Sequence, residues 1–198
     1  MNIISNSCLG AFIQKDFLKQ PYSNPFCWNV IEDNSIINLI SMYDTINFKK
    51  YELLRGNNLP YYTDKDCNFY LNIDNKVKVY YVHYRFSKND TKPRKANYGN
   101  ATDILYNKIW KYIIDCYEKR LQRMKDEPIF VLGSSWSGGA LKYDTIKRIS
   151  NIRTNYKIIM TSNIDIDFKL PSNCYYYKHN VFRNNLKLSK EVFEKYFK

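Results

Sequence analysis

Two hydrophobic patterns alternate along the chain. Short apolar runs predict buried strands at Asn2–Ser5, Pro128–Gly133, Lys157–Thr161 and Cys174–Lys178. Apolar residues at helical spacing predict helices over Leu9–Leu18, Asp33–Met42, a long segment from Thr102 or Asp103 to Met124, a short one from Lys142 or Asp144 to about Ile149, and Ser189–Phe197. Strands that alternate with helices in this order are typical of a mostly parallel sheet built through right-handed crossovers.

The segment before the long helix has a different pattern. Two β-rich runs, Phe69–Ile73 and Val77–Phe86, flank Asp74-Asn75-Lys76, which predicts a hairpin. Phe48–Arg55 predicts one more short helix. The polar segment Ser87–Asn100 predicts a loop.

These elements predict an α/β fold of three layers. A mostly parallel sheet carries helices on both faces, and a β-hairpin is inserted before the long helix. A chain of 198 residues with 44% hydrophobic residues can bury a core without disulfides or metal. We therefore expect a single α/β domain over residues 1–198.

Cysteine usage and the N-terminus indicate a reducing compartment. The five cysteines occur singly, with no CxxC pair and no histidine at ligand spacing: Cys8, Cys27, Cys67, Cys116 and Cys174. We expect reduced thiols, no metal site and no cofactor. The N-terminus lacks the order of a signal peptide, and no apolar run approaches about 18 residues, so we expect a cytoplasmic protein.

A strongly basic balance constrains the partners. The chain has 31 Lys and Arg against 19 Asp and Glu, a formal net charge of +12. This charge attracts phosphates, anionic glycans, nucleic acid or an anionic membrane surface. The basic residues are dispersed from Lys15 to Lys198, which argues against specific nucleic-acid binding. We expect an anionic glycan or a nucleotide-linked or acylated small-molecule substrate, and peripheral membrane association stays open.

Cys8 is the first candidate for chemistry. If Asn2–Ser5 is the first strand, Cys8 lies at its carboxyl end, at the start of the next helix. The helix dipole would lower the pKa of a thiol in that position, and the amides of Leu9 and Gly10 would be free to bind an oxyanion. The alternative is that Cys8 is a small buried residue.

A thiolate nucleophile needs a base, and the chain has two histidines, His83 and His179, each at the end of a predicted strand. His83 is preferred because the loop after it could supply an orienting group such as Asp90, Asn89 or Asn97. Either histidine could instead be structural.

Two polar turns are further candidates. The turn SSWSGG follows the strand ending at Gly133, and Ser134 and Ser135 could bind an anionic substrate, although the glycines match neither a Walker motif nor GxGxxG. The alternative is a plain strand-to-helix turn. Asp165 and Asp167 in SNIDID could hold a cation or serve as acid and base, or could be solvated turn residues.

Several separated motifs coincide with known families. The segments IISNSCLGAFIQKDFL, YSNPFCWNVI, VHYRF and YEKRLQRMKDEPIFVLG resemble, in this order, a bacterial family of unknown function described as papain-like cysteine peptidases. The matching residues are Cys8, Pro25, Phe26, Trp28, His83, Arg120 and Arg123. The chain is also similar to a related family found near exopolysaccharide and capsule genes, through Ser5, Asn6, Cys8, Gly10, His83 and Tyr84. Cys27 stands where the first family has Asp, and Ser7 and Leu9 replace Asn and Trp of the second, which leaves a third catalytic residue open.

The resemblance implies a cysteine-dependent enzyme in which Cys8 attacks an acyl group and His83 exchanges the proton. We therefore predict an acyl-transfer enzyme, transferase or hydrolase, of surface-polysaccharide or glycoconjugate biosynthesis. Two alternatives remain. One is a non-catalytic binding module for an anionic glycan or nucleotide-sugar, and the other is a glycosyltransferase-like enzyme that uses Asp165 and Asp167 on a metal.

Overall fold

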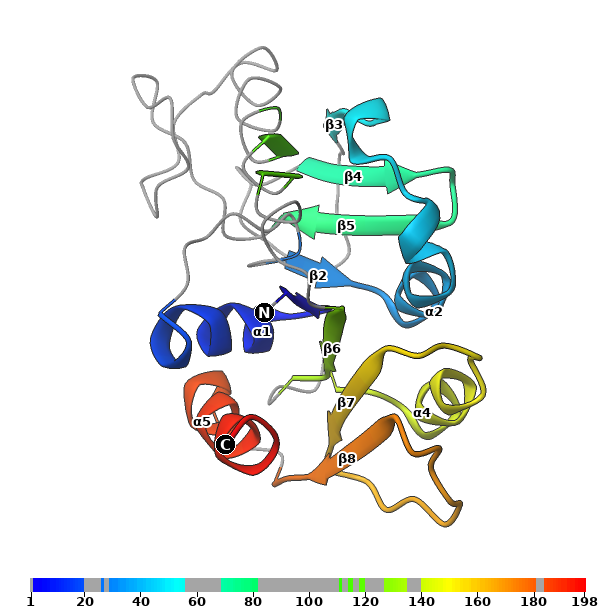
Figure 1. Cartoon of the computed structure of the whole chain (residues 1–198). Coiled ribbons are helices and arrows are strands. Elements are labelled where there is room, and N and C mark those ends of the chain that lie inside the picture. Colours follow the sequence, from blue (N-terminus) through cyan, green and yellow to red (C-terminus); the bar gives the residue numbers. More distant parts are fainter. Residues whose placement is uncertain are drawn as a thin grey trace.

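The computed structural model describes residues 2–19, 26, 29–55, 69–81, 111, 114–115, 118–119, 127–134, 140–180 and 184–198. Its centre is a parallel sheet of four strands in the order β1-β6-β7-β8 (Figure 1). The strands are β1 (Asn2–Ser5), β6 (Pro128–Leu132), β7 (Lys157–Ser162) and β8 (Cys174–Lys178). The predicted strands agree with these bounds to within one residue. Strands β1 and β6 pair directly, although more than 100 residues separate them in the sequence.

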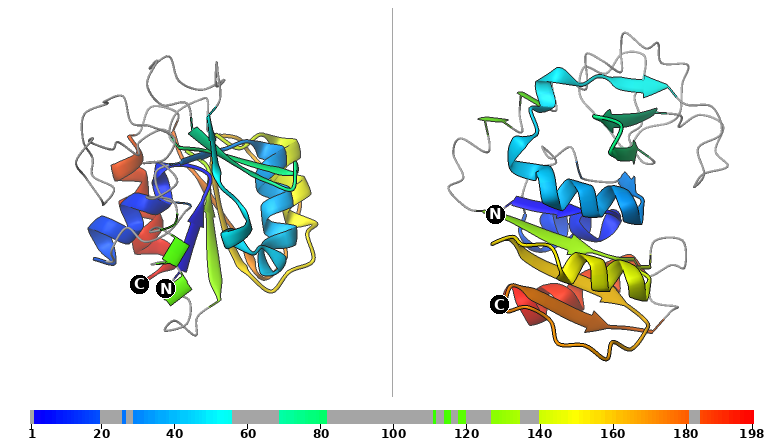
Figure 2. Two further views of the ribbon diagram at one scale, coloured as in Figure 1. Left: turned by 90° about the horizontal axis from the view of Figure 1, so that it is seen from above. Right: turned by 90° about the vertical axis from the view of Figure 1, so that its right-hand side faces the viewer.

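Helices cover both faces of this sheet (Figure 2). On one face lie α1 (Cys8–Phe12), which continues as the π-helix η1 (Ile13–Phe17), and α5 (Asn185–Tyr196). On the other face lie α2 (Asp33–Met42) and α4 (Tyr143–Ser150). The structure thus confirms the predicted α/β fold with a mostly parallel sheet between two helical layers.

Alternating side chains explain why the middle of strand β7 is a continuous apolar run. In β7, Ile158 and Met160 join the hydrophobic cluster on the α2 and α4 side, whereas Ile159 joins the cluster with Leu9 of α1 and Leu188 of α5. All three strand residues are fully buried. A strand covered on both faces needs an apolar side chain at every position, and this produces continuous runs rather than alternation.

The predicted hairpin is confirmed as the centre of a second, antiparallel sheet. Strands β4 (Phe69–Ile73) and β5 (Val77–Tyr81) pair around a turn in which Asp74 and Asn75 both have positive φ, as a type I′ turn requires. The strands β2 (Asn29–Ile31) and β3 (Leu53–Arg55) extend this sheet to the order β2-β5-β4-β3.

The two sheets are joined through one hydrophobic cluster. Leu71 and Val79 of the antiparallel sheet pack in the same cluster as Ile4, Phe130 and Ile158 of the parallel sheet. The backbone amide of Ile31 in β2 also donates to the carbonyl of Asn6, just beyond β1, at 3.1 Å. This continuity is compatible with the predicted single domain, which stays a prediction.

Two of the predicted helices differ from the structure. The predicted helix over Phe48–Arg55 is wrong: a 3₁₀ turn, η3 (Phe48–Lys50), is followed by strand β3, because Leu53 and Leu54 pair with Leu71 and Tyr70 of β4. Helix α5 begins four residues before the predicted start at Ser189, because the side chain of Asn184 caps it by accepting from the amide of Lys187.

The long predicted helix up to Met124 is described in part. Lys111, Ile114, Asp115, Glu118 and Lys119 are helical, and Ile114 is buried. The polar loop predicted over Ser87–Asn100 lies outside the described residues. Within the described part of the chain, no helix combines the length and apolar character needed to cross a membrane.

Candidate functional site

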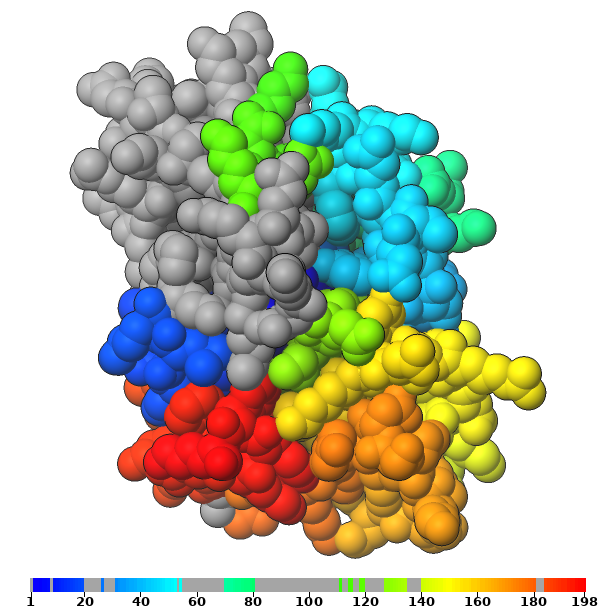
Figure 3. Space-filling model, viewed as in Figure 1, coloured from blue at the N-terminus to red at the C-terminus, as the bar shows by residue number. Residues whose placement is uncertain are grey.

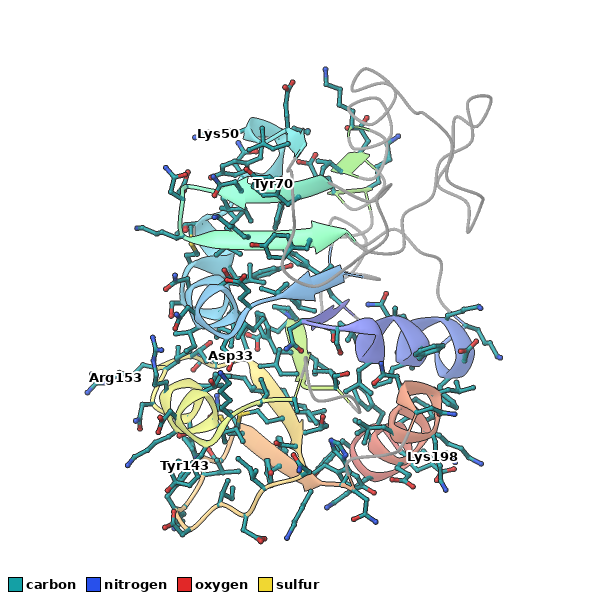
Figure 4. All side chains as sticks on the ribbon, turned by 180° about the vertical axis from the view of Figure 1, so that it is seen from behind. Asp33, Lys50, Tyr70, Tyr143, Arg153 and Lys198 are labelled. Atoms are coloured by element: carbon teal, nitrogen blue, oxygen red, sulfur yellow. The ribbon has the colours of Figure 1, made fainter. Side chains whose placement is uncertain are left out.

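The carboxyl edge of the parallel sheet brings two separate sequence motifs together. Strand β1 leads into α1 on one face, whereas the chain after β6 reaches α4 on the opposite face (Figure 2). Adjacent parallel strands whose connections leave to opposite faces have a crevice between their carboxyl ends, where α/β proteins commonly bind ligands. Cys8, the first residue of α1, and the turn that begins at Gly133 and Ser134 lie at this edge. Figure 4 views the molecule from this carboxyl edge of the sheet.

Polar side chains tie the turn before Cys8 to strand β6. The Ser5 hydroxyl donates to the carbonyl of Val131 at 2.7 Å, and the Ser7 hydroxyl donates to the carbonyl of Gly133 at 2.5 Å. The amide of Gly133 donates to Asn6 Oδ1 at 2.8 Å. Ser5, Asn6 and Ser7 are all buried. The backbone leading into Cys8 is therefore held by hydrogen bonds that water does not reach.

The expectation that the Leu9 and Gly10 amides are free is wrong in this structure. The amide of Leu9 donates to Ser7 Oγ, and the amide of Gly10 donates to Ser5 Oγ, each at 3.2 Å. Serine hydroxyls close to a helix start commonly satisfy its first amides in this way. Because both amides have intramolecular acceptors, we no longer assign oxyanion binding to Leu9 and Gly10.

Gly133 is a point of close approach between strands β6 and β7. Its φ of +111° lies in a region that favours glycine. A Cβ atom at this position would also overlap the backbone carbonyl and the hydroxyl of Thr161. The glycine therefore permits both the backbone direction after β6 and the contact with the end of β7.

Ser134 is buried beside the start of α5. Its hydroxyl donates to Asn185 Oδ1 at 3.3 Å, and the Ser189 hydroxyl lies 2.6 Å from the carbonyl of Asn185 and 3.2 Å from the carbonyl of Leu9 in α1. These contacts join the start of α5 to the turn after β6 and to α1. Ser135 lies outside the described residues, so the substrate-binding role predicted for Ser134 and Ser135 stays a prediction.

The preferred base, His83, lies outside the described residues. The second histidine, His179, directly follows β8 and is 5% exposed. Strands β1 and β8 form opposite edges of the sheet, separated by three strand spacings or about 14 Å. The strand order therefore does not pair His179 with Cys8 across the sheet.

His179 and Thr161 each carry a buried polar atom without a hydrogen-bond partner in the described part of the chain. These atoms are His179 Nε2 and Thr161 Oγ1. His179 Nδ1 lies 2.9 Å from the carbonyl of Asn180, which can only accept, so Nδ1 carries a proton and the Nε2 of the neutral ring is an acceptor. Both residues lie at the carboxyl ends of neighbouring strands.

The aspartates of the turn after β7 are engaged by side chains of this chain. Asp165 accepts from Lys178 Nζ at 2.6 and 2.7 Å, and Asp167 accepts from the Tyr143 hydroxyl. The hydrogen bond from Tyr143 is the main reason that the pKa of Asp167 is lowered. Among the described residues, no three His, Cys, Asp or Glu side chains are grouped as metal ligands.

Cys174 shows the environment of a structural cysteine. It is the first residue of β8, has a free thiol and is 6% exposed. Burial raises its pKa to about 11, so it is a poor nucleophile near neutral pH. The side chain of Cys8 lies outside the described part, and so do Cys27, Cys67 and Cys116.

Sequence reasoning named Asn6 only within the resemblance and gave no role to Asn6 or Thr161. Both are buried polar residues beside the end of an apolar parallel strand. A polar side chain directly after such a strand is a signal that could have indicated them, because the carboxyl edge gathers these residues.

No protein-family model matches the chain, and no curated protein matches it. The resemblance to the two bacterial families therefore rests on the quoted motifs alone and stays a prediction.

Proposed function

We propose that the chain is a cysteine-dependent acyl-transfer enzyme with Cys8 as the nucleophile. The observation that carries this proposal is the position of Cys8 at the first turn of α1, at the carboxyl edge of the sheet where the paired strands β1 and β6 end. The buried hydrogen bonds of Ser5, Asn6 and Ser7 fix the backbone there before any substrate binds. A fixed backbone lowers the cost of orienting a nucleophile.

The proposed reaction has two steps. The Cys8 thiolate attacks the carbonyl carbon of an acyl donor, and the leaving group departs with a proton from the protonated base, which leaves a thioester on Cys8. An acceptor hydroxyl or water then gives its proton to the base and attacks the thioester, which releases the thiolate. His83 is the proposed base on the resemblance alone. Oxyanion stabilisation has no residue assigned to it.

The proposed substrates follow from charge. A net charge of +12 favours a nucleotide-linked, phosphorylated or acidic glycan over a neutral one. The resemblance adds surface-polysaccharide or glycoconjugate biosynthesis as the process, and the cytoplasm stays the predicted compartment.

Formation of an acyl-enzyme tests the proposal. p-Nitrophenyl acetate would release p-nitrophenolate in a burst and leave an acetyl group on Cys8, which peptide mass spectrometry locates. Cys8→Ala and His83→Ala should remove the burst, whereas Cys174→Ala should keep it. Acetylation that is slow, or that is no faster at Cys8 than at Cys174, would contradict the proposal.

A second candidate function is a non-catalytic binding module at the same edge. The unpartnered His179 Nε2 and Thr161 Oγ1 favour it, because a ligand hydroxyl can donate to Nε2 and accept from Oγ1. Calorimetric titration with a nucleoside diphosphate sugar distinguishes the two functions. Binding that is retained in Cys8→Ala but lost in Thr161→Val, without any acyl-enzyme in the native chain, would favour the binding module.

A further inference from the structure

A groove lies at the amino edge of the parallel sheet, opposite the edge that carries Cys8. Its cavity of about 650 Å³ is bounded by the end of α2, by Asp44, by Glu127 and Pro128 before β6, and by residues 153–156 before β7. This volume is in the range of small-molecule sites. Figure 3 shows this face, with the residues after α2 in cyan, the start of β6 in light green and the segment before β7 in yellow.

Tyr156 lines the groove, and its hydroxyl has no hydrogen-bond partner among the described residues. The residue is 8% exposed, and its ring packs against Tyr43 and Phe130. This buried hydroxyl forms no hydrogen bond of normal geometry within the described part of the chain. Burial is the main cause that raises the pKa of Tyr156, and the interaction of the hydroxyl with Asp44 and the charges of Asp44, Tyr43 and Glu127 raise it further, so both carboxylates lie close to it. A buried hydroxyl without a partner is unfavourable unless a ligand or water completes it.

The groove is locally acidic in a strongly basic chain. The carboxylates of Asp44 and Glu127 both line it, and neither forms an ion pair with another of the described residues. The last turn of α2, with Ile40 and Ser41, ends at the groove, and a helix C-terminus favours a cation.

The cations near the groove compete little for these carboxylates. Lys49 lines an adjoining cavity that shares Asp44, but Glu118 pairs with it at 2.5 Å. Arg153 also lines the groove, but it is exposed to solvent, and Figure 4 labels it at the periphery of the molecule. The described residues provide no third carboxylate, histidine or cysteine beside Asp44 and Glu127, so an organic cation suits the groove better than a metal ion.

We propose that this groove binds the ammonium group of a small-molecule amine. The three N–H donors of a primary ammonium match the acceptors on Asp44, Glu127 and the Tyr156 hydroxyl. The site is independent of Cys8 and goes beyond the proposed acyl-transfer function.

Titration of the ¹⁵N-labelled full chain with butylammonium chloride tests the site. We expect saturable shifts of the amides of Asp44 and residues 154–156, with a Kd of about 10 mM or tighter at physiological salt. Neutral 1-butanol should give no saturable shift. Asp44→Asn and Glu127→Gln should each weaken binding about tenfold, and Tyr156→Phe should weaken it less. The matched control is Asp165→Asn, an exposed carboxylate beyond the opposite ends of the strands, which should bind as the native chain does.

Three results with the butylammonium probe would overturn the proposal. These are an absence of saturation, equal shifts with 1-butanol, and equal affinity of the native chain and Asp44→Asn. Asp44 is exposed, so its substitution leaves the fold intact and an unchanged affinity cannot be attributed to misfolding. Nα-acetyl-lysine N-methylamide, whose side-chain amine is free, serves as a parallel probe. If it binds at least tenfold tighter than butylammonium, the groove takes a lysine side chain of a partner rather than a small amine, and the proposal is wrong.

Discussion

The two edges of the parallel sheet differ in how their polar groups are used. At the carboxyl edge, Asn6 and Ser7 are buried, carry no charge and bond to the neighbouring strand. At the amino edge, Asp44 and Glu127 are charged, exposed and without an ion pair among the described residues. One edge is organised before a ligand arrives, and the other offers charge in an open groove. The first arrangement suits positioning of a reacting group, and the second suits reversible binding.

The comparison also shows where polar residues contribute to stability. A buried hydrogen bond that loses one partner leaves an unsatisfied group behind, whereas an exposed carboxylate is solvated with or without neighbours. Substitutions at the carboxyl edge should therefore affect folding, and matched substitutions at the amino edge should affect binding alone.

The largest effect is expected at Gly133. Gly133→Ala should destabilise the protein by about 3 kcal/mol or more, because the added methyl group overlaps Thr161 and the backbone has positive φ. Asn155→Ala, at the exposed amino edge, should stay within about 0.5 kcal/mol. Urea unfolding of both variants measures the difference. Equal midpoints would show that the end of β6 adapts and is not a rigid contact.

Cys174, the first residue of β8, should make the free energy of unfolding depend on pH. Burial raises its pKa from 9.0 to about 11, so between these values the thiol ionises in the unfolded chain but not in the folded one. The buried neutral thiol contributes fully to the free energy of unfolding below pH 9. This contribution falls by about 2–3 kcal/mol as the pH rises to 11. The difference in free energy of unfolding between the native chain and Cys174→Ala should shrink over this interval. A constant difference would mean that the thiol ionises freely in the folded protein.

Asn6 and Asp44 sharpen the comparison between the edges directly. Asn6→Ala removes the acceptor for the buried amide of Gly133 and should cost about 2 kcal/mol. Asp44→Asn should change stability by less than about 0.5 kcal/mol. Thermal and urea unfolding of the pair provide the measurement, and a larger loss in the Asp44 variant would reverse the assignment of the two edges.

The smallest effect is expected at Tyr143, an exposed contact at the start of α4. Its hydroxyl is the main cause that holds the pKa of Asp167 below the ordinary value. Tyr143→Phe should raise that pKa, so the carboxylate would take up its proton at higher pH. Carbon NMR titration of the aspartate carboxyl groups follows this change, and no rise would mean that the backbone hydrogen bond of Asp167 suffices.

Local pattern was sufficient for most of the fold. The apolar run at Lys157–Thr161 could be recognised because a strand buried on both faces tolerates few polar residues. Cys174–Lys178 is a half-buried edge strand, and its three tyrosines, a residue type enriched in strands, made it recognisable. The hairpin turn Asp74-Asn75 has the residue types that accept positive φ. Strand β3 could not be predicted, because Leu53 and Leu54 become a strand only through pairing with β4, which is distant in the sequence.

The residues of the candidate site could be recognised in the sequence, but the contacts between them could not. Cys8 and the turn after Gly133 were each recognised, but their adjacency depends on the pairing of β1 with β6. A serine cap such as Ser7 on the Leu9 amide is typical of a helix start, but the use of the Gly10 amide by Ser5 depends on the shape of the turn between them. Asp44, Glu127 and Tyr156 are far apart in the chain, so the groove emerges only from the tertiary fold.

The pairing of β1 with β6 has a consequence for the order of folding. The strands β6, β7 and β8 follow one another closely and can associate through short loops, whereas β1 must close a loop of more than 100 residues to reach β6. Loop closure of this length is entropically slow, and contacts of large sequence separation form late. The Cys8 turn would therefore assemble in the final step, so that nascent or partly refolded chains would keep an incomplete crevice until the N-terminal strand docks.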